Sequence, residues 1–281
     1  MPWTSKHTKW FVDTGKPLKT ADGKDVVVLE FQHQDDDEVL SAWAKHFRNH
    51  YCLDAEIDFL RAKRTRQVYL NGIKFPCVTS KLGPGIRAGD FGEILVADYL
   101  QWLLGFWVPR VRWGSKVIRD ESPKGSDVIG FRIHKKNSTS SKDVLAVFET
   151  KTEFSGSGKN RLQDAINDSA KDHLRIDESL NFIKQKLFER KEIKQAQLVE
   201  RFQSPVDIPY KETYGAAAII SEEHFDPNII ARADCRKIPK SAKSKEFMSH
   251  PNSKNLILVI IKGADMMTLV HELYRRAADE A

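Results

Sequence analysis

Short apolar runs, separated by segments of helical periodicity, most constrain what this chain can fold into. Such runs occupy residues 26–29, 144–148, 214–221 and 255–262. They have the length of strands and are apolar on both faces, which is typical of a sheet covered by helices on both sides. We therefore predict the α/β class, with a mixed central sheet flanked by helices.

The stretch 81–85, Lys-Leu-Gly-Pro-Gly, is the clearest break in the chain, because Gly and Pro together oppose both helix and central strand. We place a domain boundary there, with residues 1–80 as a small N-terminal α/β extension of unknown role and residues 81–281 as the main domain. Within the extension the patterns predict a strand over 25–31, helices over 35–50 and 54–64, and a hairpin over 68–75 that turns at Asn71-Gly72.

Beyond the break the patterns alternate between helical and extended. Apolar residues recur at helical spacing from 89 to 105. The remaining predicted strands cover 106–113, 126–133, 144–152, 214–221 and 255–262, and the remaining helical segments cover 160–173, 176–202 and 264–277.

Composition excludes several classes of protein. The chain has 281 residues, 41% of them hydrophobic, and 45 Lys plus Arg against 39 Asp plus Glu give a net charge of +6, which is ordinary for a globular protein. No apolar run approaches the roughly 18 residues of a membrane span, and the N-terminus lacks a signal-peptide core. We expect a cytoplasmic protein that does not contact a membrane.

Familiar cofactor and metal motifs are missing from the sequence. The three cysteines, Cys52, Cys77 and Cys235, have no C-x-x-C spacing, and the nine histidines show neither H-x-H nor H-E-x-x-H spacing. Walker A, G-x-S-x-G and dinucleotide-binding fingerprints are also absent from the sequence. A disulfide framework, a zinc site, an ATPase and a nicotinamide enzyme are therefore disfavoured.

The predicted strand 144–152 ends in charged residues. Glu149 and Lys151 are two positions apart, so the period of a strand places both on one face. Charges at the end of a core strand are costly without partners, and a divalent metal with a phosphate would partner both. A solvated ion pair explains the same spacing, so the motif alone is weak.

Two further acids precede this strand. Asp127 stands at the mouth of the predicted strand 126–133, where it could face Glu149, although a turn-forming Asp after Gly125 is equally ordinary. Glu93 opens the helical segment that starts at Gly89, where a first-turn Glu is usually a contact with the helix dipole.

The joint order is more specific than its parts: helix with Glu93, strand with Asp127, strand with Glu149-x-Lys151. It resembles the PD-(D/E)xK nuclease fold, with Ser126-Asp127 in place of the usual Pro-Asp. Within residues 82–154 the chain also resembles the HamA family, the nuclease subunit of the bacterial Hachiman antiphage system. The segments that carry this resemblance are Gly83-Pro84-Gly85-Ile86-Arg87, Gly89-Asp90-Phe91-Gly92-Glu93, Gly125-Ser126-Asp127 and Phe148-Glu149-Thr150-Lys151.

The resemblance implies a metal-dependent DNA nuclease restrained by a superfamily 2 helicase partner, HamB. Asp127, Glu149 and the backbone carbonyl of Thr150 would then bind Mg²⁺, or Mn²⁺ in its place, because hard cations prefer oxygen ligands. Glu93 would hold a second ion or a bound water, and Lys151 would orient the attacking water and stabilise charge on the phosphate.

Near the start of the helical segment 160–173, Lys159 and Arg161 are expected to contact phosphates, and Gln163 to contact the DNA backbone or the metal shell. A solvated position on the helix explains Gln163 at least as well. The basic stretch 236–245 is either a phosphate-binding loop or a solvated connector. Two alternatives to the regulated nuclease stay open: a non-catalytic nucleic-acid-binding or scaffold subunit, and a standalone restriction or repair nuclease.

Overall fold

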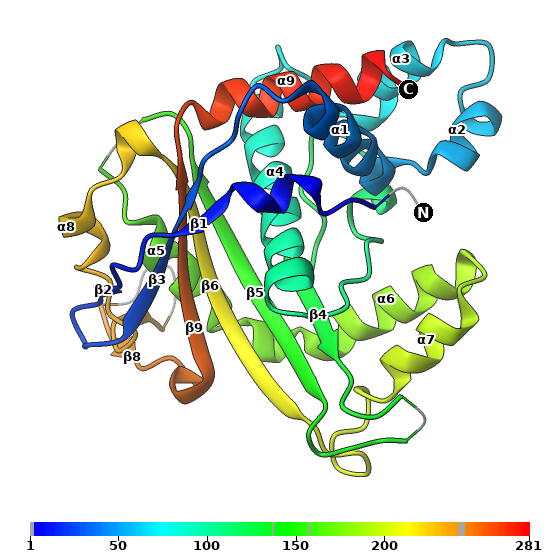
Figure 1. Ribbon diagram of the computed structural model, residues 1–281. Coiled ribbons are helices and arrows are strands. Elements are labelled where there is room, and N and C mark those ends of the chain that lie inside the picture. Colours follow the sequence, from blue (N-terminus) through cyan, green and yellow to red (C-terminus); the bar gives the residue numbers. More distant parts are fainter. Residues whose placement is uncertain (1–2, 137, 157, 241–244) are drawn as a thin grey trace.

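The fold is built on one large mixed sheet, whose strands lie side by side across Figure 1. The computed structural model describes residues 3–136, 138–156, 158–240 and 245–281. Within these residues seven strands pair in the order β1-β3-β9-β6-β5-β4, with β2 beside β3. Their bounds are β1 Phe11–Asp13, β2 Leu18–Lys19, β3 Asp25–Phe31, β4 Val128–Arg132, β5 Val144–Glu153, β6 Lys211–Ser221 and β9 Leu256–Gly263. A separate small pair joins β7 Ile238–Pro239 to β8 Phe247–Met248.

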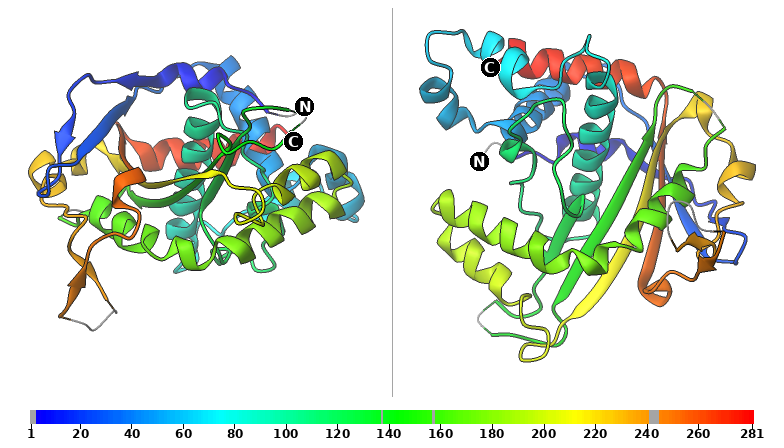
Figure 2. Two further views of the ribbon diagram at one scale, coloured as in Figure 1. Left: turned by 90° about the horizontal axis from the view of Figure 1, so that it is seen from below. Right: turned by 180° about the vertical axis from the view of Figure 1, so that it is seen from behind.

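The centre of the sheet is parallel and its edges are antiparallel. Strands β3, β9, β6 and β5 run in one direction, whereas β1 and β2 oppose β3, and β4 opposes β5. The parallel strands are apolar on both faces because helices cover both, as predicted. Figure 2 shows the curl of the sheet and its two helical layers.

The helices divide between the two faces. Helices α1 Asp37–Tyr51, α4 Gly83–Asp98 and α9 Met266–Asp279 share one buried core with alternate side chains of the sheet, among them Ala146 and Phe148. Helices α5 Arg161–Ser169, α6 Ile176–Glu189, α7 Ile193–Glu200 and α8 Pro227–Ile230 cover the other face, where Leu145 and Val147 are buried. The alternation follows from the two-residue period of a strand.

Short helical segments complete the chain. Helices α2 Asp54–Leu60 and α3 Arg66–Tyr69 lie at one end of the molecule, near the C-terminus (Figure 1). Single-turn 3-10 segments are Lys6–Trp10, Trp113–Ser115, Asp172–Leu174, Glu222–His224 and Ser253–Asn255, and π-helical turns are Leu70–Lys74 and Tyr99–Leu103.

Most predicted elements are confirmed to within a few residues. The strands predicted over 25–31, 126–133, 144–152, 214–221 and 255–262 correspond to β3, β4, β5, β6 and β9. The helix predicted over 35–50 is α1, whose N-cap Asp36 accepts a hydrogen bond from the N–H of Val39. The segment predicted as one helical stretch over 176–202 forms two helices, α6 and α7.

The predicted hairpin over 68–75 is wrong. Residues 66–74 form α3 and a π-helical turn, and Asn71-Gly72 lies inside that turn. Tyr69 and Leu70 are buried in the α1–α9 core, so tertiary packing overrides the local turn preference of Asn-Gly.

The predicted strand over 106–113 is also wrong. Only Trp107 makes a ladder contact, an isolated antiparallel bridge to Phe131. The segment and the residues that follow it to Lys116 instead supply cations to the buried acids of α4. The ion pairs are Arg110 with Asp98, Arg112 with Glu93 and Lys116 with Asp90.

The break at 81–85 is the first turn of α4, which begins at Gly83 with Pro84 in its first positions. Pro is tolerated there because its missing N–H would have no partner within the helix. Strands from both sides of residue 80 share one sheet and one core. The division into two domains stays a prediction.

The remaining expectations concern membranes and cysteines. Across the described ranges no helix is long and apolar enough to cross a lipid bilayer. Cys52, Cys77 and Cys235 are free thiols, and Cys52 and Cys235 are buried, where they pack as small apolar residues.

Candidate functional site

The acids predicted on two neighbouring strands meet at one end of the β4–β5 pair. Val128 pairs with Phe148, so Asp127, one step before β4, continues the antiparallel register opposite Glu149. The Oδ2 atom of Asp127 accepts a hydrogen bond of 3.0 Å from the backbone N–H of Thr150. Asp127 is thereby held against the strand that carries Glu149 and Lys151.

Glu149 is a buried carboxyl group with an unpaired oxygen. The residue is 6% exposed, and its Oε2 has no hydrogen-bond partner among the described residues. Burial raises the pKa of Glu149 to about 9, and the nearby Asp127 adds to the shift while Lys151 opposes it. An acid kept this far from water gains strongly from a bound cation.

Lys151 lies on the same face of β5 as Glu149, as predicted. Its Nζ is 2.9 Å from Glu149 Oε1 and 2.8 Å from Asp168 Oδ2 on α5. Burial works to lower the pKa of Lys151, but Glu149 and the hydrogen bond to Asp168 outweigh burial and raise it. The ammonium is therefore charged, fixed between the carboxyl groups of Glu149 and Asp168, and still 26% exposed.

Glu93 approaches from the opposite layer. α4 lies close on β5 because Gly92 has no side chain: a Cβ there would stand 2.4 Å from the Thr152 methyl group. Glu93 Oε2 accepts hydrogen bonds from Arg112 Nε at 3.0 Å and Trp113 Nε1 at 3.1 Å. Burial raises the pKa of Glu93 to about 8, against the lowering effect of Arg112.

Arg112 is the residue that joins the parts of the site, and sequence reasoning missed it. Its guanidinium pairs with Glu93 and, through Nη2 at 3.0 Å, with Asp127. The same group donates to the backbone carbonyls of Pro123, Lys124 and Ser126. Arg112 thus holds the loop before β4 and both acids in one network.

A second buried carboxylate lies one turn before Glu93. Asp90 Oδ2 accepts from the hydroxyl of Tyr51 on α1 at 2.6 Å and from Lys116. Burial raises the pKa of Asp90, and its two donors oppose that shift. This contact fixes the middle of α4, and with it Glu93, against α1.

The acids have cationic partners from the chain itself. Arg112 is paired with Glu93 and Asp127, and Lys151 with Glu149. Over the ranges that the structure describes, no three His, Cys, Asp or Glu side chains are grouped as a metal-binding cluster. The donor set still suits a hard cation at Asp127 and Glu149, because both offer carboxylate oxygens and one oxygen of Glu149 is unpaired.

These residues line an open groove of about 720 Å³. Its walls include Glu93, Asp127, the 149–155 end of β5, and Arg161 at the start of α5. Arg161 also borders an adjoining groove with Lys151, Lys171 and Lys240, so the predicted phosphate contact lies beside the acids.

The structure does not bring every predicted residue to the groove. The Oε1 of Gln163 accepts from the N–H of Asp234 at 2.7 Å, and its Nε2 donates to Asn167, so its amide ties α5 to the 234 loop. Lys159 is exposed just before α5. Thr150 is buried, with its side chain on the α4 face and its N–H on Asp127.

The basic stretch 236–245 is partly neutralised. Arg236 pairs with Asp234, and Lys240 pairs with Glu246 while bordering the groove beside Lys151. The position of Lys243 lies outside the described residues.

No sequence pattern indicated that Asp168 and Arg112 belong to the site. Asp168 follows Lys151 by seventeen positions and reaches it only because α5 folds back on β5. Arg112 sits in a segment whose alternating pattern favoured a strand, and its true neighbours are side chains from α4 and the loop before β4.

One of two comparisons with known proteins identifies the family of this chain. A search of curated proteins finds none that matches the chain. The family model HamA matches residues 6–277, nearly the whole of the 281-residue chain. The chain therefore belongs to the HamA family, and this membership implies a role in Hachiman antiphage defence.

Proposed function

We propose that this protein is a metal-dependent DNA nuclease of PD-(D/E)xK type, the effector subunit of an antiphage complex with a superfamily 2 helicase partner. One observation carries the proposal. The β4–β5 register puts Asp127 opposite Glu149, with Lys151 two residues further along on the face of Glu149. Two acids and a lysine in this arrangement suit phosphodiester hydrolysis.

The residues divide the chemistry between them. Asp127, Glu149 and the carbonyl of Thr150 would hold Mg²⁺, or Mn²⁺ in its place; such an ion polarises a phosphate and lowers the pKa of a water. Lys151, fixed by Asp168, would donate to the attacking water or to a phosphate oxygen. Glu93 would hold a second ion or a metal-bound water only if its ion pair with Arg112 breaks.

Cations around the groove suit a polyanionic substrate. Arg161 and Lys151 line it, and Lys171 and Lys240 continue the line into the adjoining groove. Each phosphate contact would release counterions, so DNA affinity should fall with salt.

A second candidate is a non-catalytic nucleic-acid-binding or scaffold subunit. The observation that favours it is the Arg112 network, which already neutralises two of the acids without an added ion. A standalone restriction or repair nuclease shares the same site and differs in needing no helicase.

Cleavage of linear and circular plasmid DNA with Mg²⁺ or Mn²⁺ tests these candidates, with and without the helicase and ATP. The proteins compared are the wild type, Glu149→Gln, Lys151→Ala and the matched control Glu223→Gln, an exposed acid that is not among the residues lining the groove. We expect a loss of roughly 10²-fold or more for the two site variants, the order expected for removing one electrostatic stabiliser, and no change for the control.

The outcomes separate the candidates. Cleavage that requires the helicase supports the regulated effector, and cleavage without it supports the standalone nuclease. If folded wild-type protein binds DNA but cuts it under none of these conditions, the result supports the non-catalytic binding or scaffold subunit.

A further inference from the structure

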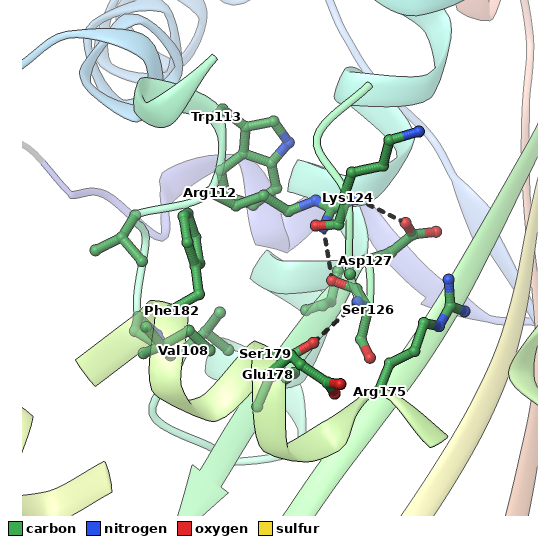
Figure 3. A pocket seen from close by; sticks show the side chains of 16 residues that line it. Val108, Arg112, Trp113, Lys124, Ser126, Asp127, Arg175, Glu178, Ser179 and Phe182 are labelled. Atoms are coloured by element: carbon green, nitrogen blue, oxygen red, sulfur yellow. Dashed lines mark hydrogen bonds and ion pairs between the residues drawn. The ribbon is translucent and has the colours of Figure 1, made fainter. Parts of the chain in front are cut away.

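A second hollow, of about 370 Å³, lies beside the carboxylate groove (Figure 3). Its walls come from the 108–113 segment, the start of β4 and α6. The surface of the hollow is mainly apolar, with contributions from Val108, Val111, Ile129, Phe182 and Ile183. Such a hollow suits a flat, largely apolar group.

The two hollows share a wall. Arg112, Lys124, Gly125, Asp127 and Arg175 line both. In Figure 3 Lys124, Asp127 and Arg175 stand on one side of the hollow, and Val108 and Phe182 on the other. A ligand with an anionic end at Asp127 and Lys151 could therefore extend a planar group toward Phe182.

Gly125 keeps this shared wall thin. Its φ of +93° belongs to the left-handed region, and a Cβ there would stand 3.0 Å from Ser179 Oγ on α6. The next residue donates its backbone N–H to the same Ser179 hydroxyl at 3.3 Å. The loop between the hollows is thus fastened to α6 without side-chain bulk.

The hollow carries charges of both signs beside its apolar surface, because Asp127 and Glu178 line it together with Lys124 and Arg175. Arg175 pairs with Asp172 at 3.2 Å, while its buried Nε has no partner among the described residues. Lys124 is exposed beside it. Cationic groups at the mouth and an apolar interior match a nucleotide, whose sugar-phosphate is charged and whose base is flat.

We propose that this hollow receives an unpaired nucleobase of the DNA strand whose phosphate lies at Asp127, Glu149 and Lys151. The inference rests on the proposed nuclease function and names the substrate form. A base inserted into the hollow against Phe182 cannot remain paired, so the site favours single strands or frayed ends over intact duplex.

Phe182 and Phe188 on α6 provide a matched test. Phe182 lines the hollow, whereas Phe188 is 65% exposed and outside it. Binding to short fluorescent single strands is measured by anisotropy in EDTA, so that no strand is cut. One strand carries bases, including 2-aminopurine as a stacking probe, and the other is an abasic strand of the same length.

We expect the wild type and Phe188→Ala to prefer the base-bearing strand by roughly tenfold, in line with base–aromatic stacking, and to change the 2-aminopurine signal. Phe182→Ala should lose this preference and signal. If Phe182→Ala fails to fold, Phe182→Leu, which keeps apolar volume, should show a reduced preference.

Equal binding of base-bearing and abasic strands by the wild type, or equal behaviour of the two alanine variants, overturns the base pocket. Metal-dependent plasmid cleavage that persists alongside either result leaves the proposed nuclease standing. Absence of both strand binding and cleavage in folded protein would overturn the nuclease proposal too.

Discussion

Asp127 accepts a hydrogen bond from the backbone N–H of Thr150 across the end of the β4–β5 pair, at 3.0 Å. The bond ties Asp127 to the residue between Glu149 and Lys151. The spacing of the two acids therefore depends on strand register, which is rigid, more than on the rotamer of a long side chain.

Arg112 is expected to be the main electrostatic support of the site. Arg112→Gln leaves Glu93 and Asp127 without their cation and should lower the free energy of unfolding by about 3 kcal/mol, the order seen when one partner of a buried ion pair is removed. Urea unfolding monitored by circular dichroism measures the loss.

A double variant checks the cause. Adding Glu93→Gln to Arg112→Gln should recover part of the lost stability, because one unpaired buried acid is removed. Arg275→Gln is the control: its side chain is 57% exposed and its partners Glu272 and Asp279 are also partly exposed, so the change should cost under about 1 kcal/mol. A strictly additive double variant would contradict a direct Arg112–Glu93 coupling.

The buried carboxyl group of Glu149 is expected to lower the free energy of unfolding at neutral and alkaline pH. Its folded pKa of about 9 lies above the ordinary 4.5, so the folded state holds a proton that the unfolded state releases. Stability is then lost as pH rises from 4.5 toward 9. Glu149→Gln, which mimics the protonated acid, should unfold at higher urea concentration than the wild type at pH 8, by more than about 1 kcal/mol.

The same comparison at acid pH serves as its control. Near pH 4.5 the two proteins should converge, because Glu149 is then protonated in the folded state and partly so in the unfolded state. A difference that stays constant with pH would point to packing and not to ionisation.

His46 is expected to make the protein sensitive to acid. Burial lowers its pKa to about 4, although Asp98 opposes the shift. As the pH falls from 6.5 to 4, the unfolded state binds a proton at His46 that the folded state does not bind. The free energy of unfolding therefore decreases as the pH falls through this range. The loss from this group at pH 5 should be about 2 kcal/mol.

The histidine variants isolate this contribution. His46→Gln should lose about 2 kcal/mol less than the wild type between pH 7.5 and 5, by urea unfolding. His33→Gln, at a half-buried ring that contacts the carbonyl of Ala264, is the control for removing a histidine elsewhere in the chain. Parallel pH profiles for wild type and His46→Gln would refute the assignment.

Gly92 is expected to set the approach of α4 to β5. Gly92→Ala puts a methyl group against the Thr152 side chain, so we expect a loss of about 1–3 kcal/mol and reduced cleavage as Glu93 shifts. Gly89→Ala, on the same helix with no atom within 4 Å of its Cβ, should be neutral or stabilising by up to about 1 kcal/mol. Equal effects would mean that helix propensity and not packing governs both.

Arg161 is expected to contribute one phosphate contact. In EDTA, Arg161→Gln should weaken DNA binding and reduce the slope of log affinity against log salt by about 0.9. Lys19→Gln, at the far edge of the sheet on β2, is the control and should change neither. An unchanged slope for Arg161→Gln would remove it from the DNA path.

The sequence by itself determined the class of fold and the elements that carry the main site residues. Apolar runs of strand length and helical periodicity are local patterns, so β4, β5, β6, β9, α1 and the position of Glu149 beside Lys151 could be read from them. The joint order of Glu93, Asp127 and Glu149-x-Lys151 was read from these elements, and the resemblance to PD-(D/E)xK nucleases and to HamA suggested what the residues do.

The tertiary structure alone decided what surrounds those residues. Segment 106–113 and the Asn71-Gly72 turn follow their packing against α4 and the α1–α9 core, which outweighs local propensity. Arg112, Asp168 and the hollow beside Phe182 depend on contacts between elements far apart in the chain. Such contacts produce no periodic pattern in a single sequence. The partners of these side chains are set only when the helices pack against the sheet.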